Sequence, residues 1–319
     1  MVQSEAVELD NIDRALIAAL IQDGRATYAA LAPKVELSQA AVRTRVQRLL
    51  DEQVITVTGR VDPASFGLGV FAFVFLEVSG ELDKVAARVA DIDDSVFVVE
   101  ATGRFDLLVE LRCHDNDGLL AALDQVRVLE GVRRLQSAKV LHYEKQDWTN
   151  VANAAAQPIA RPQPAPAHEL DDIDRRLLRE LMADGRATYA TLATLVDLSQ
   201  AAVRDRVIDL LESDVVTIQA HPVPEAMGIG GFAGLAVKAT GPVGPLATFV
   251  AEMPESCLVV RTLGRFDLLA EIWFDDDDHL AEILDRLREV QGMGSIDTVP
   301  YLRIALESFG PGARQASDR

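Results

Sequence analysis

The heptapeptide Leu-Ser-Gln-Ala-Ala-Val-Arg stands at residues 37–43 and again at residues 198–204. The same offset of 161 residues carries Asp-Gly-Arg-Ala-Thr-Tyr from 23–28 onto 184–189, and Gly-Arg-Phe-Asp-Leu-Leu from 103–108 onto 264–269. A constant offset over three separate blocks indicates an ungapped duplication, and its length far exceeds the period of a solenoid repeat. Each half of the chain is therefore predicted to be a complete, foldable module.

The composition is typical of a globular protein with more than one domain. Of the 319 residues, 49% are hydrophobic and 25% are charged, a balance that favours packed cores over disorder. The N-terminal segment lacks the apolar core of a signal peptide, and no stretch reaches the ~18 consecutive apolar residues of a membrane span. We therefore expect a cytoplasmic protein with no membrane partner.

The two cysteines, Cys113 and Cys257, do not correspond under the offset. A duplicated disulfide is therefore excluded, and two thiolates are too few for a metal site. Both are expected to be buried apolar residues. The sequence predicts no metal, no cofactor and no catalytic residue.

The net charge of −19 argues against nucleic acid as a partner, because phosphate binding requires concentrated Lys and Arg. The charge is unevenly distributed, however. Residues 8–60 hold seven acids and seven bases, whereas the equivalent residues 169–221 hold eleven acids and six bases, a net charge of −5. If either half binds a polyanion, the first is better suited.

Three short helices are predicted at the start of each half. Apolar residues at spacings of four indicate a helix over 11–23, Thr27 caps a second helix over 28–34, and Ser38 caps a third that ends near Asp51. Three short helices with a tight turn before the third form a helix-turn-helix. The predicted domains of this type are residues 8–60 and 169–221.

The third helix has two contrasting faces. At 100° per residue the apolar stripe, which must face the first two helices, is Val42, Val46 and Leu49. The opposite face is Ala40, Thr44, Gln47 and Arg48, with Arg43 and Arg45 on the flanks. Such a face can read base edges and phosphates in a major groove, although an ordinary solvated helix face has the same composition.

β-Rich sequence follows the helices. Residues 54–61 are expected to form a small hairpin or wing, and residues 70–78, 81–90, 96–101, 107–113, 117–129 and 132–143 read as strand, helix, strand, strand, helix and strand. The order βαββαβ specifies a ferredoxin-like sheet with helices on one face, whose bare face needs a partner that the second copy could supply. The fold class is therefore α+β, with sheet domains at 61–147 and 222–308 and a Pro/Ala-rich linker at 148–168.

With these elements in this order, the chain resembles the Lrp/AsnC (feast/famine) family of transcriptional regulators, duplicated and fused. The residues that carry the resemblance are the Asp-Gly-Arg, Leu-Ser, Arg-Val and Gly-Arg-Phe-Asp blocks of both copies. The resemblance implies binding to double-stranded DNA, dimerisation through the sheets, further self-association, and a small effector that is commonly an amino acid. The implied DNA-binding residues are Ser38, Gln39, Ala40, Arg43, Thr44, Arg45, Gln47 and Arg48, with Ser199, Gln200, Arg204 and Arg206.

The resemblance also bears on the Gly-Arg-Phe-Asp loops. From spacing alone the loop between two strands is a hairpin in which Asp satisfies turn amides. Under the family reading, loop amides hold a carboxylate, the Asp takes an ammonium and the Arg takes an anionic group. The predicted effector residues are Thr102, Gly103, Arg104, Phe105 and Asp106, with Gly264, Arg265, Phe266 and Asp267. Because Glu100 becomes Arg261 and Thr102 becomes Leu263, the two sites are not expected to bind one ligand equally.

The two third helices also differ. The offset moves Ala40, Thr44, Gln47 and Arg48 onto Ala201, Asp205, Ile208 and Asp209, so the second face is acidic and the first head is predicted to dominate DNA binding. Two alternatives stay open. One is a ligand sensor with vestigial DNA-binding heads. The other is an enzyme similar to fused siroheme decarboxylases, although the five histidines show no repeat-matched pairing.

Overall fold

The computed structural model describes residues 8–148, 170–223, 226 and 228–308. The chain forms two compact units, each of which combines equivalent parts of the two copies. Met1–Ser65 with Trp148–Ile229 make the head unit, and Phe66–Asp147 with Gly230–Arg319 make the sheet unit. Apart from Trp148, the predicted linker at 148–168 lies outside the described residues.

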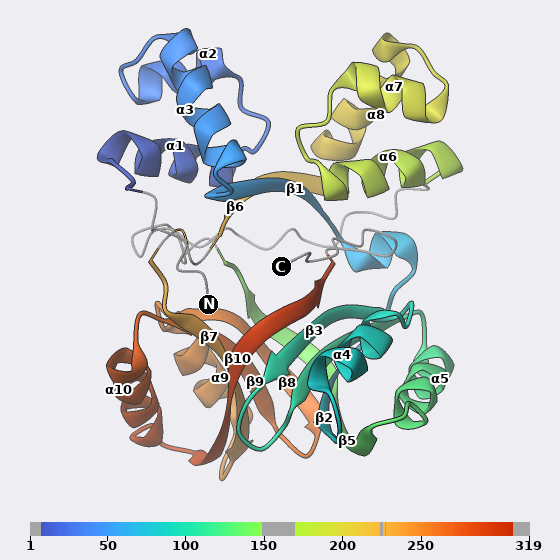
Figure 1. The fold of residues 1–319 in the computed structure, drawn as a ribbon, viewed down its shortest axis with the longest axis vertical. Helices are drawn as coiled ribbons and strands as arrows, with labels where there is room; N and C mark the ends of the chain where they lie inside the picture. The colour runs from blue at the N-terminus through green and yellow to red at the C-terminus, as the bar shows by residue number, and fades with distance from the viewer. Residues whose placement is uncertain (1–7, 149–169, 224–225, 227, 309–319) are drawn as a thin grey trace. The chain divides into compact units, whose positions relative to one another are not determined.

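The head unit contains two helix-turn-helix domains, or heads (Figure 1). The first head has α1 (Asn11–Gln22), α2 (Tyr28–Leu31) and α3 (Gln39–Asp51), and the second has α6 (Asp172–Ala183), α7 (Tyr189–Val196) and α8 (Gln200–Glu212). The predicted caps form: Thr27 accepts a hydrogen bond from Ala30 N, and Ser38 accepts one from Ala41 N. These caps satisfy amides that have no partner inside the helix, so each helix starts where the sequence predicts.

The second helix of the first head is shorter than predicted. After Leu31 the backbone tightens into a 3₁₀ turn, η1 (Ala32–Lys34), because Pro33 has no amide hydrogen to continue the α-helical ladder. The second copy has Thr194 at this position, and α7 runs unbroken to Val196. The turn before the third helix is the same in both heads, with Glu36 and Asp197 in the left-handed conformation at φ 56°.

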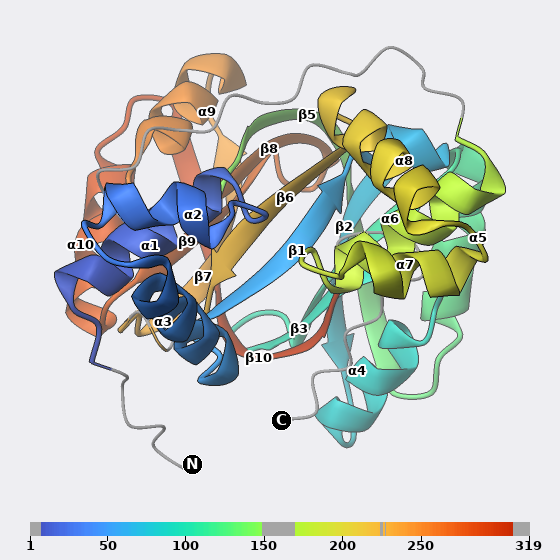
Figure 2. The same ribbon diagram turned by 90° about the horizontal axis from the view of Figure 1, so that it is seen from above.

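The expected hairpin or wing within each head does not form. Residues Ile55–Val61 are a single strand, β1, which pairs antiparallel with β6 (Val216–Pro222) of the other copy, from Ile55 opposite Pro222 to Val61 opposite Val216. β1 and β6 run side by side between the two heads (Figure 2). The branched residues therefore make one two-stranded ribbon across the duplication, and the prediction of a wing in each head was wrong. A 3₁₀ turn, η2 (Pro63–Phe66), follows β1.

The sheet unit contains the predicted βαββαβ order twice, which confirms the α+β class with a ferredoxin-like sheet in each half. The first copy has β2 (Val70–Val78), α4 (Leu82–Ala90), β3 (Ser95–Ala101), β4 (Leu107–Cys113), α5 (Asn116–Arg127) and β5 (Val132–Gln146). The second has β7 (Gly231–Ala239), α9 (Val243–Glu252), β8 (Ser256–Gly264), β9 (Leu268–Phe274), α10 (Asp277–Arg288) and β10 (Met293–Glu307).

The two sheets join at both edges. β5 of the first copy pairs with β8 of the second, and β10 pairs with β3, so that the strands close in the order β10-β3-β4-β2-β5-β8-β9-β7. Each long last strand pairs with its own sheet over one part of its length and with the other sheet over the next. The second copy therefore supplies the partner that each bare face requires. These two cross-copy strand pairs, β5–β8 and β10–β3, are called the seams below.

Each copy has its own core between the sheet and its helices. Alternate residues of β2 and β4 pack under α4 and α5, including Val74, Leu76 and Val109, and the equivalent strands β7 and β9 pack under α9 and α10. The helices lie outside the closed sheet (Figure 1). The other face of each strand points into the closed sheet. Within the described parts of the chain, no helix is long and apolar enough to cross a membrane.

Candidate nucleic-acid interface and effector site

The third helix of the first head presents an exposed polar face. Val42, Val46 and Leu49 are buried, as the periodicity predicts. The exposed predicted DNA-binding residues are Ser38, Gln39, Ala40, Arg43, Thr44 and Gln47. Three of these have local partners. Ser38 accepts from Ala41 N, the Thr44 hydroxyl donates to Ala40 O at 3.1 Å, and Gln47 Nε2 donates to Asp51 Oδ1 at 2.9 Å. Arg43 extends from this face with its charge available to a phosphate.

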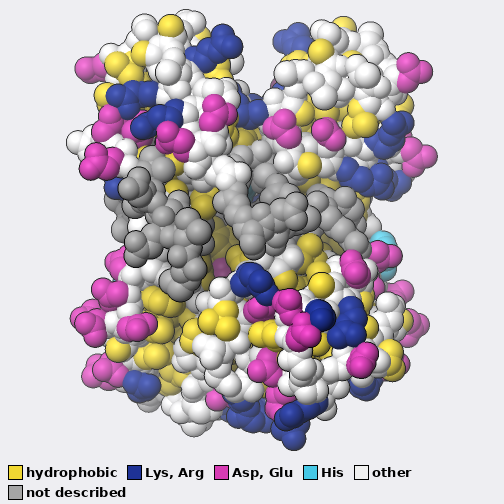
Figure 3. Space-filling view, in the orientation of Figure 1, with side chains coloured by type: hydrophobic (Ala, Val, Ile, Leu, Met, Phe, Trp, Pro, Cys, Tyr) yellow, Lys and Arg dark blue, Asp and Glu magenta, His cyan; other side chains and the backbone are white. Residues whose placement is uncertain are grey.

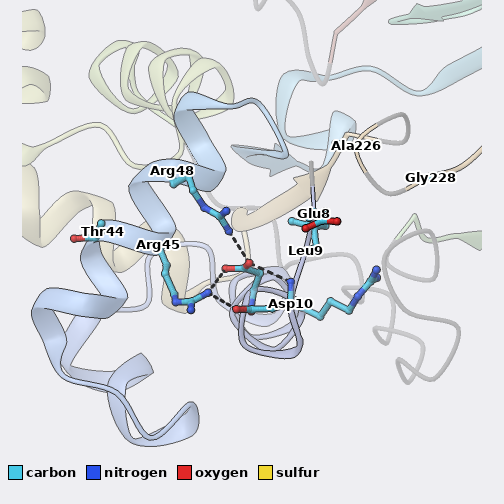
Figure 4. Close-up of a pocket in the computed structure, with 10 residues that line it drawn as sticks. Glu8, Leu9, Asp10, Thr44, Arg45, Arg48, Ala226 and Gly228 are labelled. Atoms are coloured by element: carbon cyan, nitrogen blue, oxygen red, sulfur yellow. Dashed lines mark hydrogen bonds and ion pairs between the residues drawn. The ribbon is translucent and has the colours of Figure 1, made fainter. Parts of the chain in front are cut away.

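The side chains of Arg45 and Arg48 reach towards α1 and not towards the exposed face of α3 that was predicted to bind DNA. Arg45 Nη1 contacts Asp10 Oδ2 at 2.8 Å and Asp13 Oδ1 at 2.9 Å, and Arg48 Nη2 contacts Asp13 Oδ2 at 2.5 Å. Figure 4 shows both arginines reaching the N-terminal end of α1, while Thr44 points to the other side of α3. These contacts join α1 to α3 and are called the α1–α3 lock. The prediction that Arg48 points away from the first helix was wrong.

The acids of the lock also begin α1. Asp10 and Asp13 form a capping box, in which each side chain accepts a hydrogen bond from the other residue's backbone amide. The hydrogen bond from the Asp13 amide, helped by Arg45, lowers the pKa of Asp10, although burial opposes the shift.

An open hollow of about 870 Å³ lies beside the lock (Figure 4), and the lock acids and arginines on its wall pair with one another. The lock therefore fixes the angle of the recognition helix.

The second head has half of this lock. Arg206 contacts Asp171 Oδ2 at 2.8 Å and Asp174 Oδ1 at 2.7 Å, as Arg45 does in the first head. The second arginine is missing, because Asp209 stands where the first head has Arg48. Ser199, Gln200 and Arg204 are exposed on α8, and so are the acids Asp205 and Asp209. Lys and Arg alternate with Asp and Glu over the visible face of both heads (Figure 3).

The first Gly-Arg-Phe-Asp loop packs against β10 of the other copy. Thr102 N donates to Pro300 O at 3.1 Å, and Arg104 Nη1 contacts Asp297 Oδ2 at 3.3 Å. Thr102, Gly103 and Arg104 are exposed. The second loop packs against β5, where Gly264 lies opposite Ala138, and Gly264 and Arg265 are exposed. Each loop therefore borders one seam.

The loop aspartates already have partners. Asp106 Oδ2 accepts a hydrogen bond from Val78 N at 2.7 Å, and Asp267 Oδ2 accepts one from Ala239 N at 2.9 Å. Asp267 Oδ1 also contacts Lys238 Nζ at 2.9 Å. Burial raises the pKa of Asp267, but the Lys238 ammonium and the Ala239 amide together lower it below its ordinary value. These carboxylates bind the ends of strands β2 and β7, as the turn interpretation of the sequence describes.

The loop phenylalanines belong to the core. Phe105 is 0% exposed and Phe266 is 3% exposed. Both pack against Phe75, with ring centroids 4.9 and 5.2 Å apart, and against each other at 6.3 Å. Offset and edge-on aromatic pairs of this kind add to the burial of their surfaces. The cluster connects the two loops inside the closed sheet, so these two predicted effector residues have a structural role.

The two seams differ in charge, which only the strand pairing reveals. At the β10–β3 seam Arg303 Nη2 contacts Glu100 Oε1 at 2.6 Å. At the β5–β8 seam the residue equivalent to Glu100 is Arg261, whose Nη2 contacts Glu144 Oε1 at 2.6 Å. His142, equivalent to Arg303, lies 3.8 Å from the same Glu144 oxygen. Sequence reasoning found the change at Glu100 but missed its partner, because the two residues are about 200 positions apart.

Buried acids inside the closed sheet are also paired. Glu110 and its equivalent Glu271 are each 8% exposed. Glu110 Oε1 accepts from Arg112 Nε at 2.7 Å, and Glu271 Oε2 accepts from Tyr301 at 3.0 Å. Burial and the nearby Glu271 raise the pKa of the Tyr301 hydroxyl. Among the described residues, no group of three or more His, Cys, Asp or Glu side chains is placed to hold a metal ion.

Family models match both copies of both domains. The AsnC-type helix-turn-helix domain matches residues 9–50 and 170–211, and the Lrp/AsnC ligand binding domain matches residues 71–148 and 234–310. These matches fall on the heads and on the sheets described above.

Single-copy relatives match about half of the chain. The HTH-type transcriptional regulator FL11 of Pyrococcus furiosus is 30% identical over 140 residues, which are 43% of this chain and 93% of that protein. The HTH-type transcriptional regulator Rv2324 of Mycobacterium tuberculosis is 35% identical over 136 residues, 42% of this chain and 92% of that protein.

A solved structure matches almost the whole chain. The crystal structure of the siroheme decarboxylase NirDL has a TM-score of 0.63 and 13% identity, covering 94% of this chain and 92% of that one. At that identity the likeness shows the fold alone. With both family models matched twice, the chain belongs to the Lrp/AsnC family of transcriptional regulators, with its DNA-binding and ligand-binding domains present twice in one polypeptide.

Proposed function

We propose that this regulator binds double-stranded DNA as an intrachain pseudo-dimer in which the first head dominates. The supporting observation is the contrast between equivalent faces of α3 and α8 within one head unit. Arg43 and Thr44 are exposed on α3, whereas Arg204 on α8 is accompanied by exposed Asp205 and Asp209. Carboxylates that face phosphates are repelled, and the loss of one good contact costs about 1–3 kcal/mol. The second head then reads a weaker half-site.

Arg43 and Arg204 form a matched pair for the test, because they occupy equivalent positions on the two recognition helices. Arg43→Ala and Arg204→Ala are compared by footprinting on an operator selected from random duplexes, at two salt concentrations. Arg43→Ala is expected to weaken binding about tenfold and to lower the salt slope, because it removes a phosphate contact, and Arg204→Ala is expected to do much less. Equal losses, with both half-sites protected equally in the parent, contradict the asymmetric model. No binding by the parent indicates vestigial heads.

We also propose that the effector is a small zwitterion, such as an amino acid, bound at the seams beside Gly103–Arg104 and Gly264–Arg265. Arg104 and Arg265 are exposed there, and an arginine fork suits a carboxylate. At the β10–β3 seam, Arg104 and Arg303 pair with Asp297 and Glu100. At the β5–β8 seam, Arg261 pairs with Glu144, and Arg265 adds an exposed positive charge. An acidic amino acid is therefore expected to prefer the β5–β8 seam.

Calorimetry with a panel of amino acids tests this proposal. Arg265→Gln is expected to remove the tighter site for an acidic amino acid, and Arg104→Gln to remove the weaker one. The two variants form a matched pair at equivalent loop positions. If neither substitution changes any titration that the parent shows, the loops are turns and the effector binds elsewhere.

Self-association is proposed on the basis of exposed leucines at the seams. Leu141 of β5 and its equivalent Leu302 of β10 are 61% and 63% exposed, and Leu263 of β8 is 65% exposed. Exposed apolar side chains at two equivalent positions are suited to contacts between copies, and equivalent contacts allow closed assemblies. Leu141→Glu with Leu302→Glu is expected to lower the mass measured by light scattering to that of one chain, and an unchanged mass contradicts this proposal.

We infer that the chain acts on DNA in the cytoplasm and is not an enzyme. The named relatives are helix-turn-helix regulators, and the interior acids Glu110 and Glu271 are held by Arg112 and Tyr301. Incubation with an iron tetrapyrrole carboxylate under anaerobic conditions, followed by mass spectrometry, tests this inference. Release of carbon dioxide from that compound would overturn it.

A further inference from the structure

The Asp-Gly-Arg blocks, which recur in both copies, lie where the two heads meet. Gly24 N donates to Ile218 O of the ribbon, and Gly185 N donates to Val57 O, each at 2.8 Å. The preceding aspartates hold the turn, because Asp23 Oδ1 accepts from Arg25 N and Asp184 Oδ1 accepts from Arg186 N. The turn between the first two helices of each head is thereby attached to the strand of the other copy.

Two arginines then cross between the heads in opposite directions. Arg25 donates from Nη1 to Gly185 O at 2.8 Å and from Nη2 to Ala187 O at 3.1 Å. Its guanidinium carbon lies 5.1 Å from the centroid of the Tyr189 ring, within reach of a cation–π interaction.

The second crossing mirrors the first. Arg186 donates from Nη1 to Gly24 O at 2.7 Å and from Nη2 to Ala26 O at 3.5 Å, and it lies 5.5 Å from the centroid of the Tyr28 ring. These reciprocal contacts, from Arg25 and Arg186, are called the clasp. Tyr28 and Tyr189 are the first residues of α2 and α7, so the clasp holds the helices on which the recognition helices pack.

The clasp has the chemistry of a rigid joint. A guanidinium is planar and binds two acceptors with fixed geometry, so each arginine constrains both distance and orientation. The ribbon alone is a two-stranded structure, and an isolated pair of strands is only marginally stable in water. None of these contacts needs DNA, and neither arginine lies on the exposed face of α3 or α8.

We propose that Arg25 and Arg186 are positioning residues that fix the separation and orientation of the two recognition helices and thereby set the half-site spacing that the protein accepts. Helix-turn-helix dimers read half-sites about one helical turn, or multiples of it, apart. Heads held in advance at one separation lose less entropy on binding, and they reject duplexes whose half-sites fall out of phase. This proposal rests on the DNA-binding function of both heads.

Spin-label distances test the clasp without DNA. Labels are attached at Ala40→Cys and Ala201→Cys, which are exposed and equivalent on α3 and α8, while the native Cys113 and Cys257 are buried. The parent is expected to give one narrow distance distribution by double electron–electron resonance. Arg25→Met with Arg186→Met is expected to broaden this distribution, because the ribbon and the Gly24 and Gly185 amides then hold the heads without the arginines. Each single substitution is expected to broaden it less.

The control is Arg175→Met, which removes a partly exposed arginine of the same unit that forms an ion pair with Asp172 at 3.8 Å. It is expected to leave the distribution unchanged. If the methionine pair unfolds the heads, Arg25→Lys with Arg186→Lys keeps both charges but loses the two-carbonyl geometry. A narrow, unshifted distribution in a folded double variant of either kind overturns the proposal.

Binding to DNA then tests the consequence for spacing. Duplexes carry two copies of the selected half-site at centre-to-centre separations from about 8 to about 13 base pairs, around one helical turn. The double variant is expected to lose about tenfold in affinity at the best separation and to discriminate less among the others. A spacing profile unchanged from the parent overturns the proposal. If the parent protein does not bind DNA at all, the proposed function is contradicted. The proposal about the clasp is then still tested by the spin-label distances, which are measured without DNA.

Discussion

Arg48 donates to the carboxylate of Asp13 over 2.5 Å, and the residue equivalent to Arg48 in the second copy is Asp209. The Asp13 side chain is only 2% exposed, and a buried carboxylate needs partners such as the arginines that face it. The first head holds this buried acid with Arg45 and Arg48, whereas the second head holds Asp174 with Arg206. The same difference that makes α8 acidic therefore also leaves its packing on α6 with one cation fewer.

Arg48→Ala is expected to lower the free energy of unfolding of the head unit by about 1 kcal/mol, because Arg48 is partly exposed and Asp13 keeps Arg45. Arg43→Ala, on the exposed face of the same helix, is the control and is expected to change stability by less than about 0.5 kcal/mol. Asp209→Arg is expected to stabilise the second head. Chemical denaturation followed by circular dichroism measures all three, and equal stabilities of the two alanine variants contradict the lock.

Gly185→Ala is expected to destabilise the head unit by about 1–3 kcal/mol through overpacking. An added Cβ would lie 2.6 Å from Ile218 Cγ2 and 3.1 Å from the Thr58 carbonyl carbon, at the point where the turn meets the ribbon. Gly244→Ala in α9 is the control, because no atom lies within 4 Å of an added Cβ there. It is expected to be neutral or to stabilise the protein by about 0.4–1 kcal/mol. Equal melting temperatures of the two variants in calorimetry would show that the close approach is relaxed in solution.

His221 is expected to make the ribbon sensitive to acid. Burial, and to a smaller extent the charge of Arg60, lowers the pKa of His221 from its ordinary value of 6.5 to about 4. Below pH 6.5 the unfolded chain therefore binds a proton that the folded chain does not, and stability falls as the pH falls from 6.5 towards 4. Between pH 6.5 and 5, above the main titration of carboxylates, the loss is at most on the order of 2 kcal/mol.

Calorimetric melting of the head unit at several pH values checks this prediction. His221→Gln removes the titrating group, and its melting temperature is expected to depend less on pH over that window than the parent's does. The compared quantity is the slope of melting temperature against pH, so a uniform change in stability caused by the substitution does not affect it. Parallel slopes would show that His221 is not the source of the pH dependence.

Substitutions at Asp106 separate the structural role of this carboxylate from a role in effector binding. Asp106→Ala removes the acceptor for Val78 N and is expected to cost the sheet unit about 1–3 kcal/mol. Asp106→Asn keeps an oxygen acceptor and is expected to retain most of that stability. If the carboxylate also binds the ammonium of an effector, calorimetric titration of Asp106→Asn will show weaker binding in a stable protein. If effector titration is unchanged in Asp106→Asn while Asp106→Ala is destabilised, the Asp106 carboxylate binds only the end of strand β2 and not the effector.

Local patterns predicted most of the elements. The strands Val70–Val78 and Leu107–Cys113 have the predicted bounds, and α3 starts directly after its predicted cap, Ser38. Side-chain alternation and capping are properties of neighbouring residues, so the sequence carries them directly. Two elements differ from the prediction. Pro33 ends the second helix early at η1, a signal that the sequence already contained, and residues 55–61 pair with the other copy instead of forming a wing.

The candidate site could be predicted only in part. The exposed face with Arg43 and Thr44 follows from the position of the buried stripe. The plot of the third helix at 100° per residue placed Arg48 opposite the apolar stripe. In the structure its long side chain turns towards an acid on another helix, Asp13, which lies 35 positions away in the sequence. The loop Asp106 was likewise ambiguous, because a turn and a ligand site require the same residue.

The sequence by itself determined that the chain holds two equal modules, the order of elements in each, and the unequal charge of the two recognition helices. Only the tertiary structure decided what β1 pairs with, how the sheets close, and where Arg25 and Arg186 bind. The physical reason is that strand pairing and side-chain contacts between the copies join residues that are more than 100 positions apart in the sequence. A β-strand or an arginine has the same local signal whichever partner satisfies its hydrogen bonds, so the choice of partner is made by the packing of the whole unit.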